Sequence, residues 1–316
     1  MSVTSSSPAL RIDWLLFVLL GFFWGSSYLF IKIGVDAGIQ PFTLVTLRLF
    51  IGLLLLAGVV AALRAPLPRE GRMYGHLFVL GFFSVALPFF LITWAEQFVD
   101  SALAATLTAP VPLFVIPIAA VMLHGERITL SKVVGVAIGL VGVAILVGFD
   151  VATLGRTDLS PQLALLVAAF SYALGGVYAR RFVHGLRPMI PSLFQVLFAM
   201  LMSGAAALAF EQPVATTLAL SADGIFAVIW LGLLGSGGAY LLFYRLLGRW
   251  GPTRVSLVAY LLPVWGIALG WAVLDEAIEP GLAVGTALIL IGIALVNSGA
   301  GLWRRLVTRS SLEQGR

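Results

Sequence analysis

Apolar residues fill long stretches of the chain, and polar residues gather in the short segments between them. A helix needs about 20 apolar residues to cross the hydrocarbon core of a bilayer, because each residue adds about 1.5 Å. Strands of a membrane barrel are shorter and alternate apolar with polar residues. Ten stretches of helical length follow one another: 14–34, 42–63, 76–95, 103–123, 132–149, 162–183, 189–210, 224–244, 254–274 and 281–299. The pattern predicts an all-α integral membrane protein with ten transmembrane helices.

The composition indicates that lipid is the solvent for much of the surface. The 316 residues are 60% hydrophobic and 10% charged, whereas soluble domains carry about 25% charged residues. The chain has no cysteine, and its three histidines, His76, His124 and His184, are far apart. We therefore expect no metal site and no cofactor. The basic residues occupy short connectors without interleaved aromatic residues, which argues against a nucleic acid as a partner.

The charges also predict an orientation. Cytoplasmic connectors of membrane proteins are rich in Lys and Arg. With the N-terminus on one side and ten spans, that side receives 16 of the 19 basic residues, and the opposite side receives 10 of the 14 acidic residues. We expect both termini in the cytoplasm, namely the segment 1–13 and the basic tail 304–316.

Residues 107–149 resemble a second stretch 150 positions later. At this offset Leu107 aligns with Leu257 and Glu126 aligns with Glu276. Two pairs of glycines also align, Gly135 with Gly285 and Gly142 with Gly292. The spacing predicts two repeats of five spans each, 14–150 and 151–303. Because five is odd, the second repeat enters the membrane inverted. Inverted repeats are typical of transporters, whose substrate sites lie between the repeats near the middle of the membrane.

Three prolines interrupt the fourth span. Pro110, Pro112 and Pro117 remove helical hydrogen bonds, and neighbouring hydroxyls such as those of Thr106 and Thr108 can satisfy the freed backbone groups. Pro263 lies in the ninth span, near the position that the repeat assigns to Pro112. Paired irregularities of this kind mark binding sites in transporters, so we predict helix breaks with a gating role at Pro112 and Pro263.

Short motifs occur in order along the chain: FWGSSYLFIK in the first span, LVTLRL in the second, PLFVIPIAAVMLHGERIT with GVAIGLVG across the fourth and fifth, and PVWGIALGWAVLDEAIEP with GTALILIG across the ninth and tenth. Together with ten spans, they resemble the drug/metabolite transporter superfamily, specifically its EamA-type ten-span exporters. The resemblance covers residues 14–300. It implies export of amino acids or other small polar metabolites and leaves the substrate itself open. Asp275 departs from the glycine that is usual before the second Glu of these motifs.

Arg48 lies about seven residues into the second span. A charged side chain inside a membrane is costly and is usually functional. Its guanidinium could hold the carboxylate of a substrate, or it could brace two helices through Asp36 or backbone carbonyls. For Lys32, at the end of the first span, we expect that the side chain reaches the membrane surface.

Aromatic residues with a polar atom form the other candidate site. Trp24 and Tyr28 lie four residues apart on one helix, and Tyr240 and Tyr244 form a second such pair in the other half of the chain. The two pairs could line a central cavity, or they could anchor the helices at the membrane surface. Three further candidates for substrate binding are Trp94, Tyr172 and Trp265.

For Glu126 and Glu276, which end the fourth and ninth spans, we expect structural roles: an ion pair with Arg127 or Lys132 for the first, and a capping or loop contact for the second. No Asp or Glu lies in the middle third of any predicted span. A site built from aromatic residues, hydroxyls and Arg48 therefore suits a zwitterion or a neutral solute better than a bare cation.

The sequence thus predicts a secondary transporter that exports small polar metabolites by alternating access, with a small-molecule substrate and the lipid bilayer as partners. An exporter of drugs or organic cations is the alternative. An intramembrane enzyme is a remote alternative, because no catalytic motif and no candidate catalytic residue is present. A channel is disfavoured by the inverted repeat within one chain. A monomer is the simplest expectation for the oligomeric state.

Overall fold

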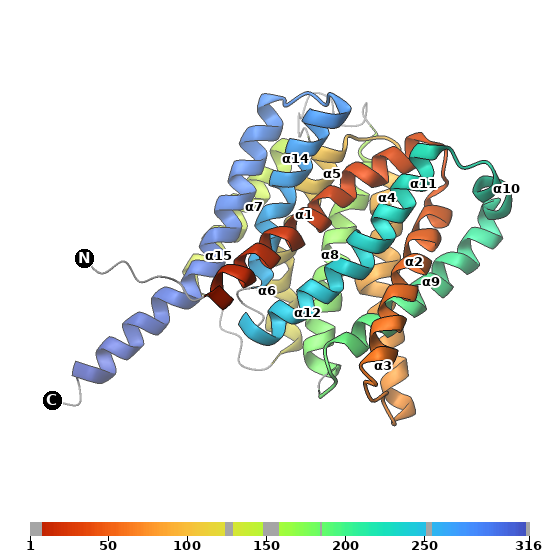
Figure 1. Cartoon of the computed structure of the whole chain (residues 1–316). Helices are drawn as coiled ribbons and strands as arrows, with labels where there is room; N and C mark the ends of the chain where they lie inside the picture. Colours follow the sequence, from red (N-terminus) through yellow and green to blue (C-terminus); the bar gives the residue numbers. More distant parts are fainter. Residues whose placement is uncertain (1–7, 124–128, 148–157, 184, 251–254, 314–316) are drawn as a thin grey trace.

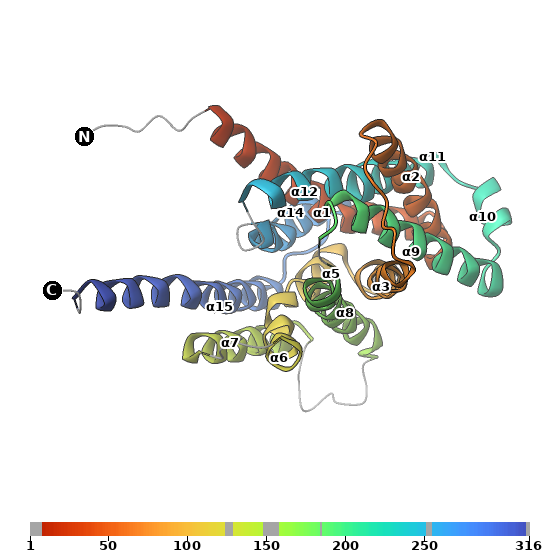
Figure 2. The ribbon, with the colours of Figure 1, turned by 90° about the horizontal axis from the view of Figure 1, so that it is seen from below.

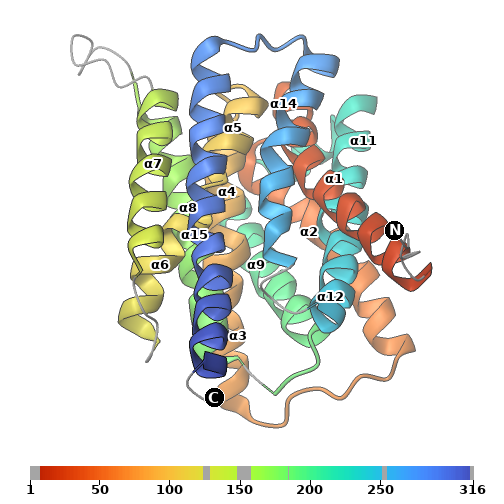
Figure 3. The same cartoon turned by 90° about the vertical axis from the view of Figure 1, so that its left-hand side faces the viewer.

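The computed structural model describes residues 8–123, 129–147, 158–183, 185–250 and 255–313, and every regular element in them is helical. Eight helical stretches are long and apolar enough to cross a membrane, and two apolar helices are shorter. Each of the ten predicted stretches coincides with one of these ten. The helices run side by side along one common direction (Figure 3). The fold is therefore that of a multi-pass membrane protein.

Several membrane-crossing stretches consist of two or three consecutive helical elements. The first half of the chain contains α1 (Pro8–Asp36), α2 (Pro41–Ala62), α3 (Gly71–Gly81), the π-helix η1 (Phe82–Ala86), α4 (Leu87–Ala95), α5 (Ser101–Thr108), α6 (Val111–Met122) and α7 (Leu130–Leu146). The second half contains α8 (Ser160–Phe182), α9 (Met189–Phe210), the short α10 (Pro213–Leu218), α11 (Ala222–Trp230), the π-helix η2 (Leu231–Gly238), α12 (Ala239–Trp250), the 3₁₀-helix η3 (Ser256–Tyr260), α14 (Leu261–Leu274) and α15 (Pro280–Glu313).

Two helices extend into the segments expected at the chain ends. Helix α1 begins at Pro8, inside the predicted N-terminal segment, and α15 continues to Glu313, through most of the predicted basic tail. Figure 1 shows α15 as a long helix whose last turns extend beyond the other helices. Hydropathy cannot find these extensions, because a helix that leaves the membrane becomes polar without ending.

The helices form two groups, each with members from both halves of the chain. In the α1 group, α1 packs on α11, η2, α12 and α14. In the α8 group, α8 packs on α3, η1, α4, α5 and α6, and α5 also packs extensively on α14 and α1 of the α1 group. Helices α2 and α9 pack on each other, and so do α7 and α15, which lie side by side in Figures 1 and 2.

Glycines allow α7 and α15 to approach closely. A methyl group at Gly135 would lie 2.6 Å from the carbonyl oxygen of Gly292, and one at Gly142 would lie 2.7 Å from that of Gly285. The contacts are reciprocal: Gly135 and Gly142 correspond to Gly285 and Gly292 at the 150-residue offset, and each glycine faces the counterpart of the other. A contact around a two-fold axis has this property. Antiparallel packing follows, since the earlier residue of one helix meets the later residue of the other.

Matching irregularities occur in the two halves. The π-helix η1 (Phe82–Ala86) lies in the third predicted stretch, and η2 (Leu231–Gly238), about 150 residues later, lies in the eighth predicted stretch. In the fourth stretch the helix breaks between α5 and α6, and in the ninth the 3₁₀-helix η3 precedes α14. π-helical turns are rare and are frequent at functional sites.

The break between α5 and α6 follows from Pro110. Because Pro110 has no N–H group, the carbonyl of Thr106 accepts from Ala109 N at 3.2 Å instead. This shift frees the carbonyl of Ala105, which accepts from the Thr108 hydroxyl at 3.1 Å. Pro112 and Pro263 lie in the first turns of α6 and α14. A missing N–H costs little in a first turn, so each of these prolines starts a helix after an irregular segment.

One end of the bundle has a continuous core. The largest cluster of buried apolar residues draws on the end of α1, the start of α2, the end of α4, α5 and the start of α8. We call this end, at the top of Figure 3, the Lys32 end. Three smaller clusters occupy the middle and the opposite end. The helices are therefore packed together most extensively at the Lys32 end.

Candidate functional site

Arg48 lies inside the bundle, on the first turns of α2, with only 3% of its surface exposed. Its Nε donates a hydrogen bond to the Ser236 hydroxyl of η2 at 3.3 Å, and its guanidinium carbon lies 4.3 Å from the centre of the Phe89 ring on α4. A cation over an aromatic face is stabilised by the ring's negative face. Asp36, the bracing partner considered from the sequence, pairs with Lys32 Nζ at 3.5 Å instead.

Tyrosines from several helices surround Arg48. Tyr28, Tyr172 and Tyr240, from α1, α8 and α12, lie near its guanidinium, as does Glu96. Tyr172 and Tyr240 are partly exposed although they lie within the bundle. The structure therefore brings four predicted site residues together: Tyr28, Arg48, Tyr172 and Tyr240.

Trp24 extends this aromatic surface. Its ring centre lies 6.2 Å from that of Tyr240 in an edge-to-face arrangement, and 5.5 Å from that of Phe243. Edge-to-face pairs of this spacing are favourable beyond the area that they bury. Tyr244 lies on the same helix α12, but its side chain is outside the described part of the structure. Trp24 and Tyr240, one from each candidate aromatic pair, are thus in contact across the two halves of the chain.

Tyr28 links α1 to the end of α5. Its hydroxyl lies 2.5 Å from the Thr108 hydroxyl, which in turn donates to the carbonyls of Ala104 and Ala105. Because the Thr108 proton points to these carbonyls, Tyr28 is the donor to Thr108. The hydrogen bond lies directly before the break between α5 and α6.

Two predicted site residues lie in packing positions. Trp265 on α14 packs against Gly25, where a methyl group would lie 2.5 Å from the Trp265 Cβ, and its ring contacts Phe22 at 5.1 Å. Trp94 lies in the last turn of α4, and its ring contacts Phe98, which is 61% exposed. Neither has a contact with Arg48 among those of the described residues. These positions suit helix packing and the membrane surface better than a solute site.

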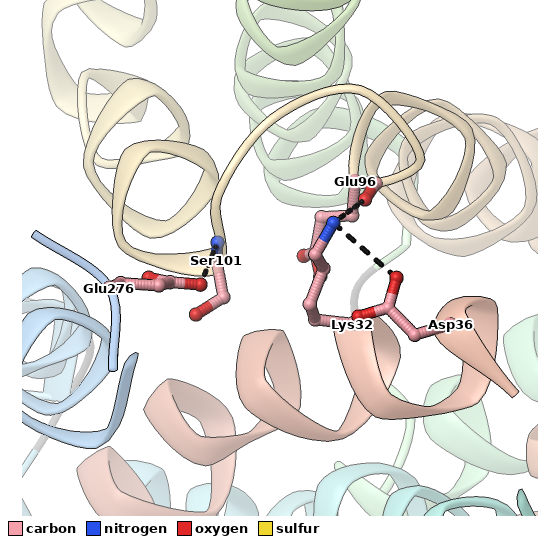
Figure 4. Close-up of polar contacts among 5 residues, drawn as sticks. All are labelled: Lys32, Asp36, Glu96, Ser101 and Glu276. Carbon is pink, nitrogen blue, oxygen red and sulfur yellow. Dashed lines mark hydrogen bonds and ion pairs between the residues drawn. The ribbon is translucent and has the colours of Figure 1, made fainter. Parts of the chain in front are cut away.

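Acidic residues of connectors cap helices of the first half. Glu276 accepts hydrogen bonds from the backbone N–H groups of Ser101 and Ala102 at 2.8 and 3.0 Å, at the start of α5 (Figure 4). Glu211 accepts from the N–H groups of Phe42 and Thr43 at 2.8 and 2.7 Å, at the start of α2. Helix N-termini favour negative charge. Glu126, the repeat counterpart of Glu276, lies outside the described residues.

Three functional candidates escaped the sequence analysis. Ser236 and Phe89 are the partners of Arg48, and Glu96 lies near it. Ser236 falls in the glycine-rich run GLLGSGG, and a hydroxyl within a predicted apolar span was the available signal. Glu96 follows α4 directly, so it was counted with the connector charges although it is buried.

Two surface hollows lie away from Arg48. The hollow of about 490 Å³ is mainly apolar and lies between α1, α11 and α14, where Trp230 Nε1 donates to the Ser26 hydroxyl at 3.0 Å. The hollow of about 540 Å³ is lined by Gly38 and Gln40 before α2, by the end of α9 and by residues within 211–216, which lead into α10. In the described residues, no three His, Cys, Asp or Glu side chains are grouped as metal ligands.

The comparisons with known proteins agree with a transporter fold. The sequence model of the EamA-like transporter family matches the chain twice, at residues 12–148 and 159–298. A crystal structure of a protein with 23% identity aligns with a TM-score of 0.65, covering 92% of this chain and 98% of that one. This similarity concerns the fold alone.

Curated relatives match nearly the whole chain at low identity. A probable amino-acid metabolite efflux pump of Escherichia coli is 26% identical over 94% of this chain and 98% of its own. The uncharacterized inner membrane transporter YedA of E. coli is 29% identical over 89% of both chains. The uncharacterized transporter YoaV of Bacillus subtilis is 24% identical over 85% of this chain and 91% of its own. Together with the apolar helices, they indicate a multi-pass protein of the bacterial inner membrane. Since the family model covers both halves, the chain belongs to the EamA-like transporter family.

Proposed function

We propose that this transporter exports amino acids or related zwitterions by alternating access around Arg48. The observation that carries the proposal is the buried guanidinium of Arg48, which is held by Ser236 and Phe89 among three tyrosines. Ser236 takes one of its five N–H donors. The planar guanidinium suits a carboxylate, which it can bind with two parallel hydrogen bonds.

Aromatic residues complete a site for the rest of such a substrate. Trp24 and Tyr240 form an edge-to-face pair next to the partly exposed Tyr172. Faces of Trp and Tyr rings attract ammonium groups, and they also pack against apolar side chains. The printed name of one relative, a probable amino-acid metabolite efflux pump, agrees with this substrate class. An organic cation without a carboxylate would meet the positive charge of Arg48 and gain nothing from it.

Ten spans in two inverted repeats, 14–150 and 151–303, complete the proposal. The supporting observations are the two family matches, the reciprocal glycine contacts between α7 and α15, and the π-helices in the third and eighth stretches. The distribution of Lys and Arg places both termini in the cytoplasm and the Lys32 end outside. The two moving bodies are then the α1 group and the α8 group.

A substrate panel on the purified protein in proteoliposomes tests the substrate class. We expect that at least one amino acid is taken up faster than in protein-free liposomes, and that unlabelled amino acid competes with it. Quaternary amines should neither be transported nor compete. Amine transport together with failure of every amino acid would contradict the proposal and favour the drug or organic-cation alternative.

A further inference from the structure

Glu96 is a fully buried carboxyl group whose two oxygens have no hydrogen-bond partner in the described structure. It directly follows α4, and its side chain is 0% exposed. Two buried hydroxyls nearby in the chain, those of Thr93 and Ser101, also have no partner there. Buried polar groups are nearly always paired, so such a set asks for an explanation.

The charged groups around Glu96 are already engaged elsewhere. On α1, Lys32 Nζ donates to the backbone carbonyl of Glu96 at 3.0 Å and pairs with Asp36 at 3.5 Å (Figure 4). On α2, Arg48 bonds to Ser236. From the connector before α15, Glu276 adds a second negative charge, which is itself held by the start of α5. The Glu96 carboxylate therefore has a nearby cation but no donor of its own.

An ionised carboxylate without donors is unfavourable in such a place, because it has lost its water and gained nothing in return. Burial raises the pKa of the Glu96 carboxyl well above its usual range, the Lys32 ammonium lowers it in part, and Glu276 raises it further. The neutral, protonated carboxyl is the form that fits this conformation. The feature to be explained is thus a protonated Glu96 carboxyl that is buried where the helices pack together at the Lys32 end.

The surroundings of Glu96 join the two helix groups. Lys32, in the α1 group, holds the carbonyl of Glu96 between α4 and α5 of the α8 group. Glu276, which follows α14, caps α5. Tyr28 on α1 bonds to Thr108 on α5. If the groups separate at this end, these contacts break and Glu96 meets water, where a carboxyl ionises at an ordinary pKa of about 4.3.

We propose that Glu96 is a proton-binding group of the transport cycle, and that the Lys32 end closes only over its protonated form. This rests on the alternating access proposed above. The sign follows from linkage. The closed state binds the proton more tightly than the open state. The free energy that favours the closed state therefore has its full value below the open-state pKa of Glu96. Closure weakens as the pH rises from there through the raised closed-state pKa, so alkaline solution opens this end.

Single cysteines can report the opening, because the chain has none of its own. Val99, in the same connector, is 9% exposed, and Phe98 beside it is 61% exposed. A membrane-impermeant methanethiosulfonate is added outside to liposomes that carry Val99→Cys. The labelling rate is divided by that of Phe98→Cys, which removes the effect of pH on the thiol. Between pH ~5.5 and ~8.5 we expect this ratio to rise severalfold, because the closed state, which binds the proton more tightly than the open state, loses its advantage as the pH rises.

In the Glu96→Gln background, the ratio should be low and the same at both pH values, because the amide mimics the protonated carboxyl. Asp100→Asn is the matched control: Asp100 is exposed in the same connector, and its substitution should leave the pH dependence intact. Glu96→Asp keeps a titratable group and should keep the dependence. A pH-independent ratio in the unmodified background, or a pH dependence that survives in Glu96→Gln, would overturn the proposal.

Two further measurements sharpen the result. Replacing sodium by choline at constant pH should not change the labelling ratio. A sodium dependence in place of the pH dependence would assign the site to a metal cation and would overturn the proposal that Glu96 binds a proton. In liposomes with a trapped pH dye, substrate flux should move protons with the Asp100→Asn variant but not with Glu96→Gln. The labelling needs no substrate, so a failed substrate panel and a failed proton site are distinguishable.

Discussion

The hydroxyl groups of Tyr28 and Thr108 lie 2.5 Å apart, although 80 residues separate them in the chain. The bond ties α1 to the end of α5, directly before the break that Pro110 introduces. One side of the break is therefore held by the α1 group, while α6 on the other side packs on α8. Because of the break, the α5 part of this stretch can be held by the α1 group while its α6 part packs on the α8 group.

Tyr28→Phe tests this tie. The variant removes a buried hydrogen bond worth about 1 kcal/mol, so the Lys32 end should open more readily. We expect Val99→Cys to be labelled about fivefold faster at constant pH, the factor that corresponds to 1 kcal/mol. Tyr74→Phe is the control, because the Tyr74 hydroxyl bonds only to the carbonyl of Pro68 in a connector. An unchanged labelling rate in Tyr28→Phe would show that the bond does not hold the end closed.

Arg48→Ala should reduce transport of amino acids about 10- to 100-fold in kcat/KM. The expected loss corresponds to about 1.5–3 kcal/mol for hydrogen bonds to a charged group. Esterified amino acids, which lack the carboxylate, should lose less. Arg48→Lys keeps the charge without the planar fork and should recover part of the activity. An equal loss for acids and esters would instead identify Arg48 as a brace between helices.

Gly142→Ala should destabilise the protein. The new methyl group would lie 2.7 Å from the Gly285 carbonyl oxygen, so α7 and α15 must move apart. Overpacking of this kind costs about 1–3 kcal/mol. Gly176→Ala on α8 is the control, since no atom lies within 4 Å of its new methyl group. Thermal unfolding in detergent should show a lower midpoint for the first variant only; equal midpoints would mean that the contact between α7 and α15 is not tight.

Glu211→Gln should weaken the start of α2. The Glu211 carboxylate accepts from two backbone N–H groups and from the Thr43 hydroxyl at 2.8 Å. Loss of a helix cap costs about 1 kcal/mol, and the expected result is a lower midpoint of thermal unfolding. Glu279→Gln, at an exposed site in a connector, should change nothing. If both variants unfold alike, the cap contributes no stability.

The orientation predicts which sites an impermeant reagent reaches. Gly281→Cys, at an exposed position of the Lys32 end, should react with a maleimide added outside intact cells. A cysteine appended after Arg316 should react only after the membrane is permeabilised. Labelling of both sites from outside would show an even number of spans between the two positions, and would contradict the proposed topology.

Hydropathy predicted the helix limits well where a helix is regular. The predicted stretches 189–210 and 42–63 correspond to α9 (Met189–Phe210) and α2 (Pro41–Ala62). It did not predict η1 and η2, because a π-turn changes the hydrogen-bond partners of the backbone without changing which residues are apolar. The prolines pointed to the broken fourth stretch, but the break lies at Pro110, while Pro112 begins the next helix.

The structure brings some of the candidate site residues together and leaves others apart. Residue type identified Arg48, Tyr28, Tyr172, Tyr240 and Trp24, since charge and aromatic rings inside a membrane are distinctive. Type alone could not separate Trp94 and Trp265 from them, because their surroundings come from tertiary packing. Glu96 was missed because burial of a connector residue depends on which helices close over it.

The seam between α7 and α15 bears on the ancestry of the chain. Each half carries both glycines that the seam requires, Gly135 with Gly142 in one half and Gly285 with Gly292 in the other. Two identical copies of one half, inserted in opposite directions, would meet through the same pair of contacts. The surface on which the halves meet is thus complementary to itself. A protein half this size could assemble as an antiparallel homodimer. Duplication of its gene and fusion of the two copies would yield the present architecture without a new interface.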